Sequence, residues 1–325
     1  MAKDTAGELS PFRILSLSGG GCLGYYTACV LQALERRARA PLISRFDLLA
    51  GTSIGGILAL TLAAGMSADR AEENFRLHGV NVFSRRPKPA GWTDGIKGIL
   101  RSLFSPKYSA EKLRSNLVTY LGDRTLGDLE VPVMITAIAI EDGSARLFSS
   151  FNREDRALKA IDVAMATSAV PAFYPLARVG GGLYIDGGLY ANAPDLQVVS
   201  ECRYGVGVPE ERIEVLSIGT TSTHFAFPKL RRLDMGALEW LMEERMVRLT
   251  ISAQQSSTDT MMRRMMGSRY LRIEARESRE EQDMLGLDVA TPEALSILAR
   301  LADESLHSVE SSRLLRSSLA GEPAG

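Results

Sequence analysis

Residues 51–55 have the types and the spacing of a serine nucleophile. They read Gly-Thr-Ser-Ile-Gly, which fits the pattern of glycine, any residue, serine, any residue, glycine. In enzymes this pattern forms a sharp turn between a strand and a helix, and the turn projects the serine hydroxyl. The neighbouring sequence supplies that context, because a strand-like run precedes the turn and an Ala/Leu-rich helical run follows it. The sequence therefore predicts Ser53 as the nucleophile of an acyl-transfer reaction.

A glycine-rich loop, Gly19 to Gly24, follows the first strand-like run and opens a helical one. Backbone N–H groups at such a helix start bind negative charge. In an acyl-transfer enzyme they form an oxyanion hole, where each donor contributes about 2.7–4 kcal/mol. We therefore expect Gly19, Gly20 and Gly21 to hold the oxyanion that forms when Ser53 attacks a carbonyl.

The same loop also fits the dinucleotide-binding fingerprint G-x-G-x-x-G, so a nucleotide-binding module is an alternative. That fingerprint requires an acidic residue at the end of the next strand, about 20 residues on. Asp47 stands at the start of that strand, and the strand leads straight to Ser53 instead. The sequence therefore favours acyl transfer over binding of a dinucleotide cofactor.

A carboxylate that could serve as a base is Asp186, which follows a short apolar run and precedes two glycines. By itself, Asp before Gly is also the ordinary composition of a turn. A serine nucleophile needs a base, however, and Asp186 follows Ser53 in the order of a hydrolase triad. Two arrangements remain open, a Ser53–Asp186–His224 triad and a Ser53–Asp186 dyad. His307 also has a suitable place in the order, although it lies on a charged helical stretch.

The elements that must position these residues alternate as in an α/β protein with parallel strands. β-prone runs predict strands at 12–17, 46–50, 131–140, 145–149, 183–185 and 213–218. Helical patterns predict helices at 25–38, from 55 to near 65, and at 109–121, 155–167, 235–266 and 292–319, before a frayed tail at 317–325. Because no internal repeat or low-complexity linker interrupts the chain, we interpret 1–325 as one domain.

Composition excludes several classes of protein. The 325 residues carry 38 Lys and Arg against 39 Asp and Glu, a balance that argues against a dedicated nucleic-acid binder. The three cysteines and three histidines show no metal-ligand spacing and no disulfide framework, so we expect neither a metal nor a cofactor. The first ten residues lack the apolar core of a signal peptide, and no apolar run is long enough to span a membrane. We expect a cytoplasmic protein whose contact with membranes is peripheral.

A basic segment, residues 81–114, departs from the even charge balance. It carries eight Lys and Arg against two acidic residues, together with Phe83, Trp92, Phe104 and Tyr108. Arginines suit phosphates, and aromatic side chains suit bases or a membrane interface. We interpret the segment as an insertion that contacts a nucleotide or lipid, or else as a solvated lid. The predicted helix at 235–266, with its Met- and Arg-rich end, is a second candidate for such contacts.

The three motifs, in this order, resemble the patatin-like phospholipase family. The resemblance rests on residues 18–24, 51–55 and 186–188, extends through 166–171 and 216–220, and covers about 12–273. It implies a three-layer α/β/α fold with a mostly parallel central sheet. It also implies a Ser–Asp dyad without histidine, in which Ser53 is the nucleophile, Asp186 the general base and Gly19, Gly20 and Gly21 the oxyanion hole.

Two positions depart from the family pattern. The family loop often begins with Asp and carries Arg or Lys before its last glycine, whereas this chain has Ser18 and Leu23. The backbone donors do not depend on those side chains, so the oxyanion hole is still expected. The departures put in doubt how the oxyanion or a phosphate is stabilised and which substrate is preferred.

A narrower resemblance, carried by the compact length and by residues 46–56, is to the cyclic-dinucleotide-activated phospholipases of bacterial anti-phage (CBASS) systems. It implies an antiviral effector that a cyclic dinucleotide such as cyclic GMP–AMP (cGAMP) activates, and that then degrades phospholipids at the inner membrane. No short motif identifies the nucleotide-binding residues, and the sequence leaves homo-oligomerisation open. The alternatives are a constitutive esterase or thioesterase acting on soluble acyl substrates, and a nucleotide-binding regulatory module.

Overall fold

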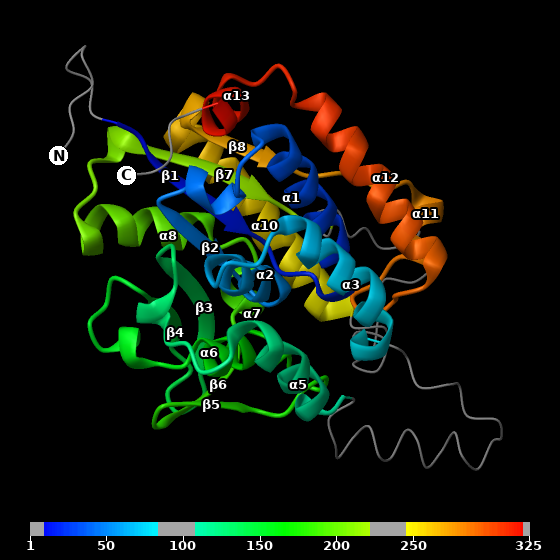
Figure 1. Cartoon of the computed structure of the whole chain (residues 1–325). Coiled ribbons are helices and arrows are strands. Elements are labelled where there is room, and N and C mark those ends of the chain that lie inside the picture. The colour runs from blue at the N-terminus through cyan, green and yellow to red at the C-terminus, as the bar shows by residue number, and fades with distance from the viewer. Residues whose placement is uncertain (1–9, 84–107, 222–244, 321–325) are drawn as a thin grey trace, which may run out of the picture.

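A mostly parallel β-sheet forms the centre of the molecule (Figure 1). The computed structural model describes residues 10–83, 108–221 and 245–320. Within these ranges the strands are β1 (Phe12–Leu17), β2 (Leu48–Gly51), β3 (Val133–Ala139), β4 (Ala145–Ser149), β5 (Ala177–Val179), β6 (Gly182–Asp186), β7 (Ile213–Ile218) and β8 (Tyr270–Ile273). Their order is β5-β6-β3-β2-β1-β7-β8, with β4 paired to β3. Strands β3, β2, β1, β7 and β8 run parallel, whereas β4 and β6 run antiparallel to β3.

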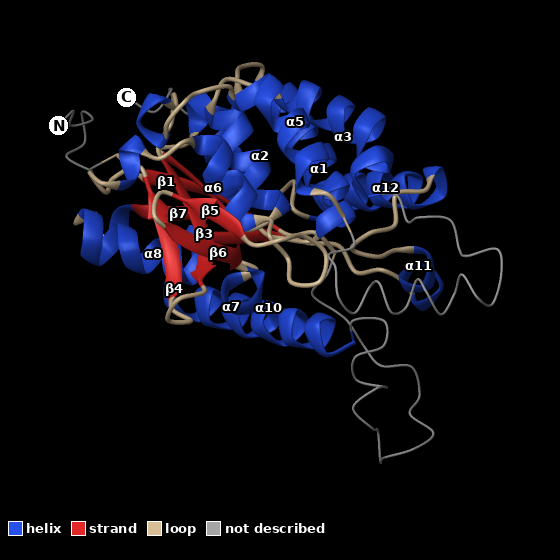
Figure 2. Cartoon of the chain, turned by 90° about the horizontal axis from the view of Figure 1, so that it is seen from below, coloured by secondary structure: helices blue, strands red, loops and turns tan. Residues whose placement is uncertain are grey.

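Helices cover both faces of the sheet, which gives the predicted three layers (Figure 2). One face carries α1 (Gly24–Ala38), α2 (Ile54–Ala63), α3 (Ala68–Phe83), α5 (Ala110–Leu121), α6 (Ala160–Thr167), α12 (Pro292–Ser308) and α13 (Arg313–Ala320). The other face carries α7 (Gly188–Ala191), α8 (Asp195–Glu201) and α10 (Arg245–Met266). A short helix, α11 (Arg279–Met284), packs beside α12.

Two hydrophobic cores follow from the alternation of side chains along the strands. On β1, Leu15 and Leu17 enter the core under α1 and α2, whereas Ile14 enters the core under α8 and α10. On β2, Leu49 belongs to the first core and Leu48 to the second. Because both faces are buried, these strands are mostly apolar, as the strands of parallel sheets usually are, and β1 carries only Arg13 and Ser16 as polar residues. The predicted fold class is confirmed.

The register of the sheet brings the predicted motifs to one edge. Leu17 pairs with both Gly51 and Ile218, and Ile218 pairs with Ile273, so β1, β2, β7 and β8 end level with one another. The loops that follow these strands therefore start side by side. Ligands bind at this carboxyl edge in open α/β sheets.

Asp186 reaches the same edge from an antiparallel strand. Its partner on β3 is Ala137, while Ile135, two residues earlier on β3, pairs with Gly51. The carboxyl end of β6 therefore lies one strand away from the turn that carries Ser53. The prediction was a mostly parallel sheet that did not single out β6, and the antiparallel direction of β6 is what places the carboxylate next to the serine.

Two predicted helices are each interrupted. The predicted helix at 155–167 consists of a 3-10 turn at Asp155–Ala157 and then α6, because the Asp155 carboxylate accepts hydrogen bonds from Ser149 N–H and from Arg146. The predicted helix at 292–319 breaks after Ser308, and α13 starts only at residue 313.

The chain end and three other regions also differ from the prediction. Residues 317–320 continue α13 with Ser318 buried, so this part of the predicted frayed tail is helical, and 321–325 lie outside the described residues. The short strands β5 and β8 were not predicted, and neither was α3. Of the predicted helix at 235–266, the structure describes 245–266, which form α10. No helix among the described residues is long and apolar enough to cross a membrane.

A buried ion network joins the sheet to α10 and α8. The Arg272 guanidinium donates to Ser217 Oγ at 2.8 Å, to Gln255 Oε1 at 2.8 Å and to the carboxylate of Glu274. It lies 3.7 Å from Asp195, whose carboxylate also accepts a hydrogen bond from the Tyr270 hydroxyl at 2.9 Å. Removing one partner of such a buried ion network leaves the opposite charge buried without a counter-ion.

Replacing Arg272→Leu should therefore destabilise the fold. The change leaves Asp195 and Glu274 without their cation, and we expect the free energy of unfolding to fall by about 3–5 kcal/mol in urea denaturation. The matched control is Arg300→Leu, because Arg300 is 47% exposed and pairs with Glu281 and Glu304 at the surface. That control should change stability by about 0–1 kcal/mol, and equal losses in both variants would contradict the role given to Arg272.

Candidate active site

A cavity of about 660 Å³ opens at the carboxyl edge of the sheet. Ser53, Asp186, Gly20 and Gly21 line it, so the structure brings together residues that the sequence placed in three separate motifs. Most of the remaining lining is apolar or aromatic, and it includes Ile54, Ile57, Leu113, Val170, Phe173, Tyr174, Leu189, Val247, Ile251 and Leu287. A long apolar chain fits such a lining better than a charged metabolite does.

Ser53 sits on a strained turn between β2 and α2. Its φ of 54° lies in the left-handed region, which costs a non-glycine residue about 1–3 kcal/mol. The surroundings hold this conformation, because Ser53 N–H donates to Thr167 Oγ1 at 2.8 Å and Thr52 Oγ1 donates to the Ala191 carbonyl at 2.6 Å. Ser53 is also the N-cap of α2, so the positive end of the helix dipole lies at the hydroxyl.

The Asp186 carboxylate lies against the Ser53 hydroxyl and accepts a hydrogen bond from Gly188 N–H at 2.7 Å. The residue is 4% exposed. Burial raises the pKa of Asp186 to about 7, and the interactions with Ser53 and Gly188 keep it from rising further. A carboxylate with a pKa near neutrality can both accept and return a proton at physiological pH.

The glycine loop turns sharply at Gly21. Its φ is +55°, and a Cβ built there would lie 2.2 Å from the Leu287 carbonyl oxygen, so a side chain does not fit. The same carbonyl accepts a hydrogen bond from Cys22 N–H at 2.9 Å. Gly19 differs from its neighbours, because its N–H donates to the Asn192 carbonyl at 2.9 Å. Of the three glycines predicted to form the oxyanion hole, Gly20 and Gly21 line the cavity, whereas the Gly19 N–H is already engaged.

The two positions that depart from the family pattern have clear surroundings. Ser18 is buried, and its hydroxyl accepts a hydrogen bond from Arg272 at 3.2 Å. Arg272 is buried as well, so a cation lies beneath the start of the glycine loop although position 23 has none. Leu23 is buried, and it lines a smaller hollow next to the cavity.

Several sequence candidates lie elsewhere. His307 is exposed on α12, where its Nδ1 contacts the Asp303 carbonyl at 2.9 Å, and it takes no part in the cavity lining. Asp47 precedes β2 at the amino edge of the sheet and accepts a hydrogen bond from Arg13 N–H. It therefore cannot be the acidic residue that the dinucleotide-binding fingerprint requires at the other end of that strand. His224 and residues 84–107 of the basic segment lie outside the described residues. In the described ranges no group of His, Cys, Asp and Glu forms a metal site.

The sequence alone gave no role to Asn192, Ser168 or Asp288, which lie around the cavity. Asn192, six residues after Asp186, and Ser168 both line it. Tyr108 donates to the Asp288 carboxylate at 3.2 Å, and both residues belong to the cavity wall. Asn192 and Ser168 stand in segments that carry the family resemblance, and Tyr108 stands in the basic segment whose aromatic residues suit bases or a membrane interface. Asp288 comes from a distant part of the chain and carries no local signal.

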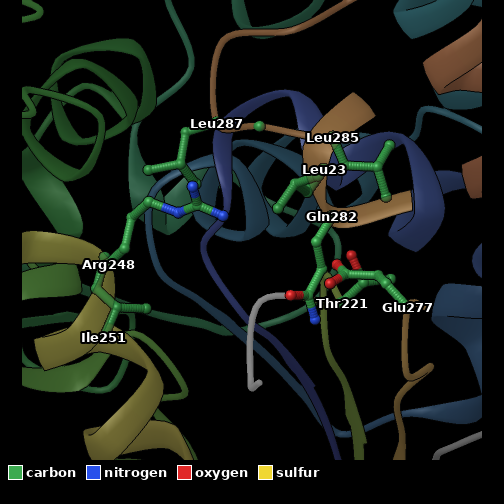
Figure 3. Close-up of a pocket in the computed structure, with 9 residues that line it drawn as sticks. Leu23, Thr221, Arg248, Ile251, Glu277, Gln282, Leu285 and Leu287 are labelled. Atoms are coloured by element: carbon green, nitrogen blue, oxygen red, sulfur yellow. The ribbon is translucent and has the colours of Figure 1, made fainter. Parts of the chain in front are cut away.

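A second hollow of about 30 Å³ lies behind the glycine loop (Figure 3). Arg248 and Ile251 of α10 form one side of it, and Thr221, Glu277 and Gln282 form the other. Burial raises the pKa of Glu277 to about 7. This space holds about one or two water molecules and no lipid or nucleotide, so the larger cavity is the candidate active site.

The raised pKa of Asp186 has a consequence for stability. The pKa of the Asp186 carboxyl is 3.8 in the unfolded chain and about 7 in the folded protein, so the folded state binds this proton more tightly. The free energy of unfolding therefore falls as pH rises from about 4 through 7. Asp186→Asn removes that loss, and it should be more stable than the wild type at pH 8 by about 2–4 kcal/mol, with a smaller difference at pH 4. Urea denaturation at both pH values measures this.

The control for that experiment is Asp303→Asn at an exposed position on α12. It should leave stability unchanged at both pH values. An Asp186→Asn variant that is no more stable than the wild type at pH 8 would show that the carboxylate is not destabilised by burial.

Comparison with known proteins identifies the family. A family model described as patatin-like phospholipase matches residues 15–198. A cGAMP-activated phospholipase from Pseudomonas aeruginosa is 34% identical over 284 residues, which cover 85% of this chain and 82% of the relative. A cGAMP-activated phospholipase from Escherichia coli is 31% identical over 315 residues, which cover 88% of this chain and 86% of the relative.

A solved structure shares the fold. Human GIVD cytosolic phospholipase A2 in complex with methyl gamma-linolenyl fluorophosphonate has a TM-score of 0.50 and 11% identity, and the match covers 98% of this chain and 60% of that one. The resemblance expected from the three motifs is therefore confirmed by the family model and by two relatives above 30% identity. The chain belongs to the patatin-like phospholipase family and is a lipid ester hydrolase.

Proposed function

We propose that this protein is a phospholipase that cleaves membrane phospholipid esters through a Ser53–Asp186 dyad, and that a cyclic dinucleotide activates it as an effector of antiviral defence. One observation carries the catalytic part of this proposal. The Ser53 hydroxyl lies against the buried Asp186 carboxylate inside an apolar cavity that the glycine loop also lines, and burial raises the pKa of that carboxyl to about 7.

The first half of the reaction forms an acyl-enzyme. Ser53 Oγ attacks the ester carbonyl carbon while its proton passes to Asp186. The negative charge that develops on the carbonyl oxygen faces the N–H groups of Gly20 and Gly21. Asp186 then returns the proton to the leaving alcohol oxygen, the ester C–O bond breaks, and the acyl group stays on Ser53.

The second half releases the fatty acid. Asp186, again ionised, takes a proton from a water molecule that attacks the acyl carbon. The second oxyanion occupies the same donors, and its collapse breaks the bond to Ser53, which recovers a proton from Asp186. No histidine is needed in either half, because the same carboxylate accepts and returns each proton.

The cavity mouth supports a lipid substrate at a membrane surface. Pro171, Ala172 and Met246 line the cavity and are exposed, and Leu176 nearby in sequence is 50% exposed. An apolar rim of this kind contacts acyl chains without a spanning segment. We therefore propose that the protein is cytoplasmic and binds the inner membrane peripherally when it is active.

Activation by a cyclic dinucleotide is proposed from the relatives, two of which are named as cGAMP-activated phospholipases and match this chain over most of its length. The basic segment at 81–114 and α10 are the regions that we propose for nucleotide or membrane contact. A constitutive esterase acting on soluble esters is the second candidate function, and dependence on nucleotide distinguishes the two.

Fatty-acid release from mixed phospholipid vesicles tests the proposal directly. We expect release only with one member of a panel of cyclic dinucleotides that includes cGAMP. Ser53→Ala and Asp186→Asn should each reduce the rate by at least about 10³-fold, because nucleophile and base act as a unit. Ser115→Ala and Asp303→Asn, at exposed positions on α5 and α12, should retain the wild-type rate.

Each alternative outcome has a definite meaning. Equal release without any nucleotide would keep the hydrolase and remove the switch. Activity on soluble esters alone would favour the esterase. Full activity of Asp186→Asn would exclude Asp186 as the base.

Activity should also depend on the ionisation of Asp186. The base must be deprotonated, and its pKa is about 7. We expect kcat/KM for a soluble ester to rise about tenfold per pH unit below pH 7 and to level off above it. A rate that is flat from pH 5 to 8 would contradict the raised pKa in the free enzyme.

A further inference from the structure

We infer that Asn192 and Thr220 are positioning residues of the oxyanion hole, which together fix the peptide between Gly19 and Gly20 so that the Gly20 N–H faces the reacting carbonyl. This inference rests on the proposed serine mechanism, and it assigns that mechanism two residues that do not touch the reacting atoms with their polar groups.

Both side chains hold the same oxygen. The Gly19 carbonyl accepts one hydrogen bond from Asn192 Nδ2 at 3.0 Å and another from Thr220 Oγ1 at 2.7 Å. Asn192 is 2% exposed and Thr220 is fully buried, so neither bond competes with solvent. Two donors on one carbonyl leave its peptide plane little freedom to rotate.

The direction of the Gly20 N–H follows from covalent geometry. The described chain has no cis peptide bond, and in a trans peptide the C=O and the following N–H point in opposite directions. The Gly19 carbonyl points into the protein, toward Asn192 and Thr220. The Gly20 N–H therefore points the other way, and Gly20 lines the cavity together with Ser53. Rotation of this peptide would withdraw the donor.

The Gly19 residue is held from its other side as well. Its N–H donates to the Asn192 main-chain carbonyl at 2.9 Å, so Asn192 forms hydrogen bonds with Gly19 through both its side chain and its backbone. A Cβ built on Gly19 would lie 2.4 Å from Asn192 Oδ1 and 3.1 Å from Ser53 Cβ, which shows how closely the three residues pack. Asn192 N–H in turn donates to Gln254 Oε1 on α10 at 2.9 Å.

The experiment compares variants that differ by single donors. Thr220→Val removes the hydroxyl and keeps the branched shape, whereas Thr220→Ser keeps the hydroxyl. Asn192→Ala removes the second donor. Thr119→Val is the matched control, because it makes the same change at an exposed α5 position that does not line the cavity. Each protein is assayed with p-nitrophenyl butyrate, with and without cGAMP, and its thermal unfolding is recorded.

We expect kcat to fall about 10-fold in Thr220→Val and in Asn192→Ala and about 10²–10³-fold in the double variant, while KM stays within about twofold. Thr220→Ser and Thr119→Val should retain kcat. A thionoester substrate provides a specific readout, because sulfur accepts hydrogen bonds weakly. The variants should lose far less rate on the thionoester than on the oxygen ester, so the preference for oxygen should shrink.

The possible failures are distinguishable. If Thr220→Val and Asn192→Ala fold, keep the wild-type kcat and keep the wild-type preference for oxygen over sulfur, the positioning role is wrong while the hydrolase stands. Equal losses on both substrates would also overturn it, since they would indicate general damage to the site. A wild type that hydrolyses neither ester nor vesicle lipid would refute the proposed function itself.

Discussion

The contact between the Ser53 hydroxyl and the buried Asp186 carboxylate is the interaction on which the site depends. It requires two conditions that a plain parallel sheet does not supply. The serine must stand on a turn with φ at 54°, and the carboxylate must arrive on a strand of opposite direction. The pairing of Ala137 with Asp186, two residues along β3 from the partner of Gly51, satisfies the second condition. Catalytic geometry in this protein is therefore a property of sheet register.

Both conditions cost stability, and the surroundings offset the cost. A left-handed serine and a desolvated carboxylate each disfavour the folded state. Opposing them, Thr52 and Thr167 bind the turn, and Gly188 N–H binds the carboxylate. The burial that destabilises the Asp186 carboxylate also raises its pKa toward neutrality, which the proposed role as a base without a histidine partner needs. The destabilisation and the function have the same cause.

The sequence predicted those parts of the site that depend on local pattern. Ser53 and the glycine loop each occupy a strand–loop–helix context, and the level ends of parallel strands explain why they meet. Asp186 was ambiguous on local grounds, because Asp before Gly also forms ordinary turns, and only its combination with the other motifs resolved it. No local sequence pattern indicates that β6 runs antiparallel to β3. A strand as short as β5 carries too few residues for a periodic signal, and the break after Ser308 interrupts a pattern that stays helical in composition.

The role of α10 could not be predicted either, because it arises from contacts between distant segments. This helix contributes Met246, Val247 and Ile251 to the cavity wall. Further along the same helix, Gln254 accepts a hydrogen bond from Asn192 N–H, and Gln255 accepts one from Arg272. Arg272 in turn donates to Ser18, which precedes the glycine loop. One helix thus contacts both the apolar cavity and the residues that hold the glycine loop. A ligand can shift a protein between two states only by the difference in its affinity for them. A ligand that bound more tightly to one placement of α10 would therefore change both the access to the cavity and the aim of its donors, without contacting Ser53 or Asp186.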